Sequence, residues 1–562
     1  MRRAALVVLL LVLAAGYVFL QTSVPSRDLA TLAPGGAVLY LEARDFGALL
    51  RDWDTSKVKT DWLASGNYEV FSQSNLYQKL AGVYQEYGTT AGFFPDLKST
   101  IGLAGTHSAL ALYGLRDVEF LYISRQGPAQ FSQSALAAVR GKFEQRQAGG
   151  VTFYMRTDPA SKRTVAFATA GGYLFLATRD DLVGRALALL AGGSDPSIAS
   201  EPWYREASTA APNHGELRLV MNLETLTKSV YFGSYWIQRN VSTVREFWAG
   251  AADLTRSPAE FSEARVFLRR PDAAAEPHSD ADQTAVRDLI ALVPPEAGMY
   301  KAFSASSAPD PATLIVNKLI SAPPPQAHDW RYAPGAMMLD QPTGSEADLE
   351  TRIDEPPLPA GAGAADAIGA VRSLVREVGV NAILEVQSSE PSGGTFVRTP
   401  AALVLAASGV WNTDEIRQAL SSATGALWTV SELGTGWVPG SAGQHTVDRL
   451  DGLGVLVFAV RGPRLFVAND PLLLAAILDR AGNTPSGSPI VYAAGFRHAR
   501  ESARYRTVMR ALDAANPPGG PAFFSDNLAS LCRVFARVSE VSVRAEDRGD
   551  RLVQHVVYRI AP

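Results

Sequence analysis

One pattern of hydrophobic and polar positions occurs twice along this chain. The stretch GGYLFLATRDDLVGRALALL (residues 171–190) has a short apolar run, a polar turn and then apolar residues at helical spacing. The stretch GPRLFVANDPLLLAAILDRA (residues 462–481) repeats that order. Each predicts a strand that ends at a turn before a helix begins, with Asp180 capping the first helix and Asn469 or Asp470 capping the second.

The similarity extends beyond these two stretches. At an offset of 291 residues, residues 165–187 align with residues 456–478 without a gap, and eight of the 23 positions are identical. Four more segments each resemble a later segment, in the same order along the chain: residues 32–40 resemble 292–300, 120–136 resemble 404–420, 201–226 resemble 493–515, and 240–254 resemble 527–541. Collinear segments of this kind predict an internal duplication.

The remaining pattern predicts an α+β fold. Short apolar runs bordered by turn residues predict strands at residues 38–41, 109–113, 120–123, 174–177, 383–386, 403–407 and 455–460. Two antiparallel hairpins are expected, one turning at Ser257-Pro258 and one at residues 547–550, with a helix over residues 365–380 and two helices within residues 46–87. We therefore expect two tandem, internally duplicated domains with mainly antiparallel sheets and packed helices.

Composition sets the expected domain boundaries. Residues 30–271 are predicted to form the first α+β repeat domain and residues 289–562 the second. Residues 272–288, which begin with a run rich in alanine and aspartate, are predicted to be a linker. Proline and glycine concentrate at about residues 321–364, where we expect insertions that lie on the surface of the second domain.

The N-terminus predicts export. Arg2 and Arg3 precede an uninterrupted apolar run over residues 4–20, which as a helix spans about 25 Å, enough for a thin bilayer core. Residues 1–21 therefore form either a signal anchor, which we favour, or a signal peptide cut after Ala14-Ala15-Gly16. As an anchor, this single transmembrane helix holds the chain in the inner membrane and leaves its bulk periplasmic or extracellular.

Charge and cysteine content narrow the function classes. The chain has 562 residues, a formal net charge of −4 and no extended run of Lys or Arg, which argues against nucleic acid as a partner. Cys532 is the single cysteine, so neither an intramolecular disulfide nor a cysteine zinc site can form. A large exported chain without disulfides fits a bacterial envelope.

Motifs for catalysis, cofactor binding or metal binding are missing from the sequence. No two of the seven histidines stand at the spacing of a metal-binding pair, and no nucleophile elbow or phosphate-binding loop is present. We therefore expect no catalytic residue, cofactor or metal. Aromatic residues do cluster, and they form either core packing or a groove for a ligand or partner; the groove would comprise Trp203, Tyr204, Tyr231, Phe232, Tyr235, Trp236 and Trp248.

Three segments carry a resemblance. They are LAPGGAVLYLEARDFGALL (residues 32–50), IGLAG (residues 101–105) and GGYLFLATRDDLVGRAL (residues 171–187). With the N-terminal membrane segment, this series resembles the large uncharacterised exported or membrane-anchored bacterial proteins that are classed as domains of unknown function. The resemblance implies an exported chain and provides no catalytic residue to carry over. The second half departs from the pattern, with PPE where the first has PGG.

Together these features predict a membrane-anchored bacterial envelope protein with a non-catalytic binding or scaffolding role. Its expected partners are the lipid bilayer, through residues 4–20, and an envelope protein or hydrophobic ligand. Two alternatives remain open. One is a periplasmic carrier of lipids or other hydrophobic ligands, and the other is an envelope hydrolase whose site assembles only in three dimensions.

Overall fold

The computed structural model describes most of the chain: residues 27–211, 215–230, 244–273, 279–307, 310–320, 362–388, 390–391, 397–428, 436–451, 455–501 and 537–561. The predicted signal anchor, Cys532 and most of the predicted insertion at residues 321–364 lie outside these ranges. Within them, no helix is both long enough and apolar enough to cross a membrane.

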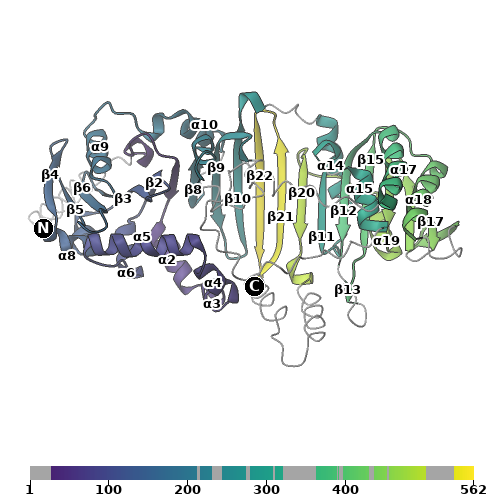
Figure 1. The fold of residues 1–562 in the computed structure, drawn as a ribbon, viewed down its shortest axis with the longest axis horizontal. Helices are drawn as coiled ribbons and strands as arrows, with labels where there is room; N and C mark the ends of the chain where they lie inside the picture. The colour runs from purple at the N-terminus through teal and green to yellow at the C-terminus, as the bar shows by residue number, and fades with distance from the viewer. Residues whose placement is uncertain are drawn as a thin grey trace, which may run out of the picture. The chain divides into compact units, whose positions relative to one another are not determined.

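The chain divides into two compact units. Unit 1 comprises residues 1–255 and 264–270, and unit 2 comprises residues 256–263 and 271–562. Both contain helices packed on antiparallel strands (Figure 1). The predicted α+β class with mainly antiparallel sheets is therefore confirmed.

The strands of unit 1 follow an order different from their order in the chain. They are β1 (Leu39–Ala43), β2 (Ser108–Gly114), β3 (Glu119–Arg125), β4 (Glu144–Ala148), β5 (Val151–Thr157), β6 (Thr164–Ala170), β7 (Tyr173–Ala177), β8 (Leu217–Met221), β9 (Phe247–Arg256) and β10 (Glu260–Arg269). Neighbours pair antiparallel in the order β4-β5-β6-β7-β3-β2-β1-β8-β9. The predicted hairpin turning at Ser257-Pro258 joins β9 to β10.

The helices of unit 1 come mainly from the β1–β2 connection and from the chain after β7. The connection holds α2 (Phe46–Thr55), α3 (Lys57–Leu63), α4 (Gly66–Ser72), α5 (Asn75–Ala91) and α6 (Leu97–Ala104). Residues 46–87 thus contain parts of four helices, where the pattern predicts two, because Ser56 and Ser74 each begin a new helix by capping it. The other α-helices among the described residues of the unit are α7 (Pro128–Ser132), α8 (Ala135–Val139), α9 (Asp180–Leu190), α10 (Pro202–Ala210) and α11 (Leu223–Leu226).

Unit 2 has the same succession of strands. They are β11 (Met299–Ser304), β12 (Val380–Gln387), β15 (Ala401–Ala407), β16 (Trp437–Ala442), β17 (His445–Asp451), β18 (Val455–Arg461), β19 (Arg464–Ala468), β20 (Tyr492–Phe496), β21 (Val538–Asp547) and β22 (Arg551–Ile560), with the small pair β13 (Glu390–Pro391) and β14 (Val397–Arg398) apart. The antiparallel order is β16-β17-β18-β19-β15-β12-β11-β20-β21-β22. Taken in chain order, β11, β12 and β15–β21 occupy the positions of β1–β9.

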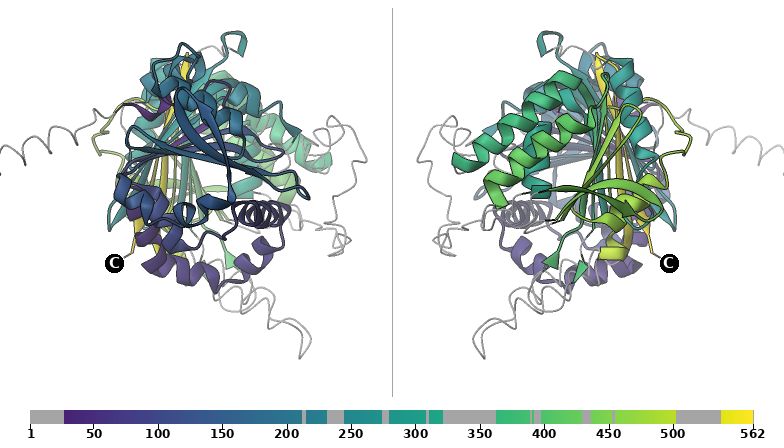
Figure 2. Two further views of the ribbon diagram at one scale, coloured as in Figure 1. Left: turned by 90° about the vertical axis from the view of Figure 1, so that its left-hand side faces the viewer. Right: turned by 90° about the vertical axis from the view of Figure 1, so that its right-hand side faces the viewer.

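The helices of unit 2 cover both faces of its strands. They are α14 (Asp280–Ile290), α15 (Pro311–Ile315), the π-helix η7 (Val316–Ile320), α17 (Ala362–Val378), α18 (Thr413–Trp428) and α19 (Pro471–Leu478). The first nine residues of α14 lie inside the predicted linker, because Ser279 caps a helix whose Val286 and Leu289 are buried. In the right-hand view of Figure 2, α17 and α18 lie side by side in green on one face of the strands.

The two units also pair their strands in the same register. In β6 and β7 Phe167 lies opposite Leu176, and in β18 and β19 Phe458 lies opposite Val467. Both pairs are separated by the offset of 291 residues found in the sequence. The residues of β3 and β15 that flank these strands match in the same way, as Leu121 pairs with Ala177 and Ala402 with Ala468.

Three of the sequence alignments need correction. The registers make Leu121 equivalent to Ala402 and Gly250 equivalent to Val541, so the alignments of residues 120–136 and 240–254 are shifted by three and four residues. The third fails because residues 493–496 form a strand, whose counterpart is β8 and not residues 201–204. Insertions and deletions in loops change the offset between strands, and an ungapped match cannot follow them.

The strand-to-helix corners at the ends of β7 and β19 differ in their caps. Asp470 caps α19 as predicted, accepting a hydrogen bond from the backbone N–H of Leu473 at 2.8 Å. In unit 1 the prediction is wrong, since Arg179 occupies the cap position without a side-chain cap and Asp180 stands in the first helical turn. The negative charges of Asp180 and Asp181 still lie where a helix N-terminus favours them.

One contact is kept at both corners by different residues. Thr178 Oγ1 accepts a hydrogen bond from the backbone N–H of Phe120 at 2.8 Å. Asn469 Oδ1 accepts one from the backbone N–H of Ala401 at the same distance. Phe120 and Ala401 are equivalent positions on β3 and β15. In each unit, the side chain of the residue that directly follows β7 or β19 therefore links the corner to the neighbouring strand.

This tie makes a testable prediction. Replacement Thr178→Val keeps the side-chain shape and leaves the partly buried Phe120 amide without its acceptor, which costs about 1 kcal/mol, the lower end of the range for buried donors. We expect the Phe120 amide to exchange with deuterium faster than in the wild type, while amides of β19 in unit 2 keep their rates. Unchanged exchange at Phe120 would contradict the assigned contact.

Candidate functional site

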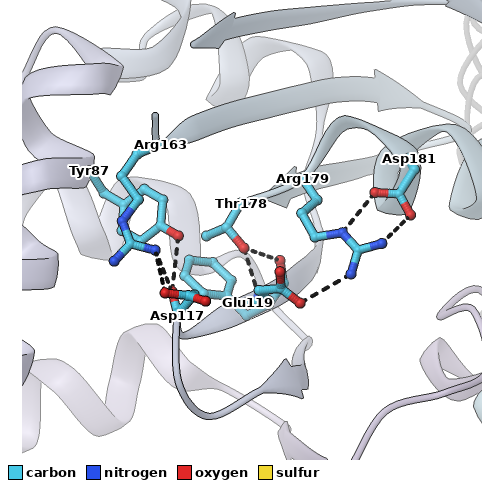
Figure 3. A network of polar contacts seen from close by, with 8 residues as sticks. Tyr87, Asp117, Glu119, Arg163, Thr178, Arg179 and Asp181 are labelled. Carbon is cyan, nitrogen blue, oxygen red and sulfur yellow. Dashed lines mark hydrogen bonds and ion pairs between the residues drawn. The ribbon is translucent and has the colours of Figure 1, made fainter. Parts of the chain in front are cut away.

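A network of charged side chains lies where the β2–β3 turn meets the end of β7 (Figure 3). Arg179 is its first centre, donating to both carboxylate oxygens of Asp181 at 2.9 and 2.7 Å and to Glu119 at 3.1 Å. These contacts, the hydrogen bond to Asp181 first among them, raise the pKa of the Arg179 guanidinium above its ordinary value. Arg179 therefore links the carboxylates of Asp181 and Glu119 through one guanidinium.

Arg163 is the second centre of the network. Its guanidinium donates to Glu86 at 2.6 Å and to the backbone oxygen of Asp117 at 2.9 Å, and its charge lies 5.5 Å from the ring centre of Tyr87. The Tyr87 ring in turn meets Phe120 edge-on at 6.2 Å. The network joins α5, the β2–β3 turn and the α9 corner, and each of its carboxylates has an arginine partner, which suits bracing better than proton transfer.

A second charged cluster lies inside unit 1. Arg218 on β8 donates to both oxygens of Asp253 on β9, each at 2.7 Å, and both side chains are only 2% exposed. Burial alone lowers the pKa of Arg218, but the bonds to Asp253 outweigh it and raise that pKa. Beside them, His107 and Glu42 lie 2.6 Å apart.

The equivalent positions in unit 2 carry different residues. The registers place Ala302 at the position of Glu42, Ala493 at that of Arg218, and Arg544 at that of Asp253. The shared strand framework is therefore formed without this buried cluster in unit 2. In unit 1 the pair links β8 to β9 through its hydrogen bonds, and the helix α10 packs on β8.

Unit 2 instead has a hollow on the face formed by β12, β11, β20 and β21. Its volume is about 390 Å³, within the roughly 300–1,000 Å³ of ordinary small-ligand pockets. The lining is mostly apolar with a few charged and polar groups, and it comprises Met299, Tyr300, Lys301, Lys318, Glu385, Gln387, Tyr492, Ala494, Gly495, Phe496, Val541 and Val543.

Among the described residues of unit 2, helices cover this face only in part, and the hollow lies beyond them. Phe303 on β11 and Ile383 on β12 are buried in the cluster formed with α17 and α18. Met299, four residues before Phe303 on the same face, is 40% exposed. Beyond the helices, the side chains of four strands thus form the floor of an open depression.

The charges in the hollow are arranged unevenly. Lys318 lies 2.8 Å from Glu385, and Gln387 donates a further hydrogen bond to the same carboxylate. Lys301 stands directly opposite Glu385 in the β11–β12 register, yet its ammonium lies over aromatic rings, 4.9 Å from the centre of Phe303 and 5.8 Å from that of Tyr492. Burial, with the Glu385 charge adding to it, raises the pKa of Tyr492.

Unit 1 has leucines at the positions that Lys301, Glu385 and Tyr492 occupy in unit 2. Lys301 corresponds to Leu41 and Glu385 to Leu110, while Tyr492 corresponds to Leu217. Charged side chains at these positions are consequently not a requirement of the strand framework. They are a property of unit 2 alone.

The predicted aromatic groove falls only partly on described residues, and two of the residues it names are buried. Trp203 and Tyr204 on α10 are buried in unit 1, 5.9 Å apart between ring centres, and Tyr204 meets Tyr40 at 5.2 Å. They belong to the core because α10 packs both side chains against β1 and β8. Trp248 is half-buried on β9, and the other four lie outside the described residues: Tyr231, Phe232, Tyr235 and Trp236.

Sequence reasoning missed the hollow, although a signal was present. Lys301 and Glu385 are the charged residues of the strands MYKAFS and VNAILEVQ, each with apolar neighbours. A charge inside a buried strand is costly unless it is paired or reaches an opening. In the described part of the chain, no cluster of three or more His, Cys, Asp or Glu is arranged to hold a metal ion.

Comparisons with known proteins identify no family. No family model matches the chain, and no curated protein matches it. The solved structure of crystal form I of TP0453 is similar over 44% of this chain and 81% of that chain, with 14% identity and a TM-score of 0.25. A TM-score this low carries no argument about fold or function.

The buried ion pair of unit 1 can be tested by its stability effect. Arg218→Met leaves Asp253 charged and unpaired, which typically costs about 3–5 kcal/mol. We expect much faster amide exchange in β8 and β9, with partial recovery in the double variant Arg218→Met/Asp253→Leu.

Lys228→Met is the matched control, because it breaks the exposed pair that Lys228 forms with Glu224. Exposed pairs of this kind contribute at most about 1 kcal/mol. If Arg218→Met were as mild as this control, the pair would not brace the unit.

Proposed function

We propose that this chain is a membrane-anchored bacterial envelope protein that binds a small, largely apolar ligand in the hollow of unit 2 and does not transform it. The observation that carries this proposal is the hollow itself, an open depression of about 390 Å³ with a mainly apolar lining and a few charged groups. Binding sites for small molecules have this composition, in which apolar surface provides affinity and a few polar groups fix orientation. Among the sequence-based alternatives, this observation favours the carrier of hydrophobic ligands.

The proposal of a binding role without catalysis is supported by the state of the charged groups. In the network around Arg163 and Arg179 every carboxylate is held by a guanidinium. In the hollow, Glu385 is held by Lys318 and Gln387. A general base needs a free lone pair within reach of a proton, and these carboxylates are instead engaged in ion pairs.

The proposed location depends on the sequence. Residues 4–20 would cross the inner membrane once, with Arg2 and Arg3 on the cytoplasmic side and both units in the periplasm. The lipid bilayer is thus the first proposed partner. A hydrophobic ligand that leaves a membrane would meet the hollow in the same compartment.

We further propose that the two units arose by duplication of one ancestral α+β unit. The identical strand order supports this, as does the shared register of β6, β7 and β3 with β18, β19 and β15. After duplication, one copy would be free to exchange apolar side chains for the charged ones of the hollow. Unit 1 would then serve as structural support, and unit 2 would carry the binding function.

The proposed topology can be tested with one thiol. Val410 in unit 2 is 91% exposed, so Val410→Cys in a Cys532→Ser background presents a single accessible cysteine. In intact spheroplasts we expect a membrane-impermeant maleimide to label it as fully as after lysis. Labelling only after lysis would contradict the periplasmic location.

The proposed binding site can be tested by photolabelling. The full chain is reconstituted in nanodiscs, irradiated with an uncharged diazirine-bearing decanol, and digested for mass spectrometry. We expect adducts on the peptides that contain Met299 and Phe496. Ala494 is half-buried on the floor of the hollow, and Ala494→Trp should reduce these adducts about tenfold, the effect of losing about 1.4 kcal/mol of binding.

Unit 1 provides a matched control. Leu219 occupies the position on β8 that Ala494 occupies on β20, so Leu219→Trp adds the same ring to the same framework outside the hollow. We expect this variant to label as the wild type does. Adducts spread evenly along the chain, or equal labelling of the Ala494→Trp variant, would refute the proposed site.

A further inference from the structure

We infer that the hollow of unit 2 selects a ligand with an apolar chain and one terminal anionic group, and that Lys301 receives the anion. This inference rests on the proposed function and adds the chemical class of the ligand. The anionic group is a carboxylate or a phosphate at the end of an acyl or alkyl chain.

The Lys301 ammonium lies in surroundings that satisfy it only in part. Its position over the rings of Phe303 and Tyr492 gives favourable cation–π contacts. An ammonium also has three N–H donors, which rings do not satisfy as an oxygen acceptor does. In the part of the chain that the structure describes, no carboxylate lies within ion-pair distance of this ammonium. An anionic oxygen from a ligand would complete its contacts.

The neighbouring carboxylate is engaged elsewhere. Glu385 is the residue paired with Lys301 across β11 and β12, and it is the natural candidate to neutralise it. Its charge is already engaged by Lys318 at 2.8 Å and by the amide of Gln387. The three charged side chains of the hollow therefore sum to one positive charge, located at Lys301.

The apolar part of the hollow extends away from Lys301. Met299 is two residues from Lys301 and on the same face of β11, and Phe496 lies opposite Met299 on β20. Val541 pairs with Phe496 and extends this apolar surface to β21. A chain bound here would lie across β11, β20 and β21 with one end at Lys301, so the hollow suits an amphipathic ligand better than a compact polar one.

Comparison of the two units indicates that the fold does not require the charges of Lys301 and Glu385. In unit 1 Leu41 and Leu110 occupy the positions of Lys301 and Glu385 in the same ladder. The fold therefore accepts apolar residues at both positions. A lysine and a glutamate at half-buried or buried strand positions carry a desolvation cost. Capture of an anionic head group is a function that accounts for keeping these charged residues.

The test uses competition against the photolabel in the full chain in nanodiscs. Three competitors share the same chain length: decanoate, decanol and decylammonium. We expect decanoate to compete at roughly ten times lower concentration than decanol, since a charge-assisted hydrogen bond is the difference between them. Decylammonium should compete more weakly than decanol. Decyl phosphate separates the two sources of anion: competition by it as well as by decanoate assigns any terminal anion, and competition by decanoate alone assigns a carboxylate.

Two variants locate the effect. Lys301→Gln retains most of the side-chain length and removes the charge, so it should abolish the preference for decanoate while decanol still competes, which shows an intact hollow. Lys318→Gln frees the Glu385 carboxylate, and we expect it to improve competition by decylammonium.

Equal competition by all three compounds, or a preference for decanoate that survives Lys301→Gln, would overturn the inference. Failure of decanoate to compete at all would overturn it as well. The proposed function fails by a different result, namely photolabelling that Ala494→Trp does not change.

Discussion

The structure depends on the antiparallel ladder that holds the central strands of each unit in register. Successive residues of a strand point to opposite faces, and a slip of one residue would exchange those faces completely. Buried residues such as Phe167 and Phe175 in unit 1, and Phe458 and Phe466 in unit 2, make any slip costly. The side chain at each ladder position therefore points to the same face in both units, whatever its chemistry.

Within this constraint the buried ion pair of unit 1 and the charges that line the hollow of unit 2 lie on opposite faces. In unit 1 Arg218 and Asp253 share the face of Tyr40, where α10 covers them and they act as a buried brace. In unit 2 the corresponding face is covered by α14 and is largely apolar at its centre, with Ala302 and Ala493. The charges that line the hollow of unit 2 lie on the other face, around Lys301, where the described helices leave an opening. The buried guanidinium of Arg218 is neutralised by Asp253, whereas the Lys301 ammonium lies at an opening where a ligand can reach it.

The sequence predicts much of this architecture because its strongest signals are local. Six of the seven predicted apolar runs lie wholly on strands, and the seventh, residues 38–41, enters β1 at Leu39; the hairpins β9–β10 and β21–β22 turn where expected. Strands with weak apolar alternation escaped prediction, notably β4 (EQRQA), in which no residue is buried. The prediction that Asp180 caps α9 was wrong because Arg179 bonds to Asp181 and Glu119. This set of contacts depends on the β2–β3 turn, which is distant in the sequence.

The candidate site was less predictable, since it depends on which part of a face the helices leave uncovered. Trp203 and Tyr204 attract attention as an aromatic pair, yet α10 directs both rings into the core. Lys301 and Glu385 are 84 positions apart in the sequence and meet only through the β11–β12 register. The net charge of the hollow also depends on Lys318, which pairs with Glu385 and so leaves the positive charge of Lys301 without a partner carboxylate among the described residues.

The most direct test of ligand capture at Lys301 is a crystal structure of the full chain grown with 10-bromodecanoate, with the anomalous signal of bromine used to place the ligand. We predict one bromine peak in unit 2 against the apolar lining near Phe496, with the carboxylate within hydrogen-bond distance of the Lys301 ammonium and the equivalent face of unit 1, at Leu41, empty. Bromine bound equally on both units, or a carboxylate directed away from Lys301, would contradict a binding role that belongs to unit 2 and depends on this lysine.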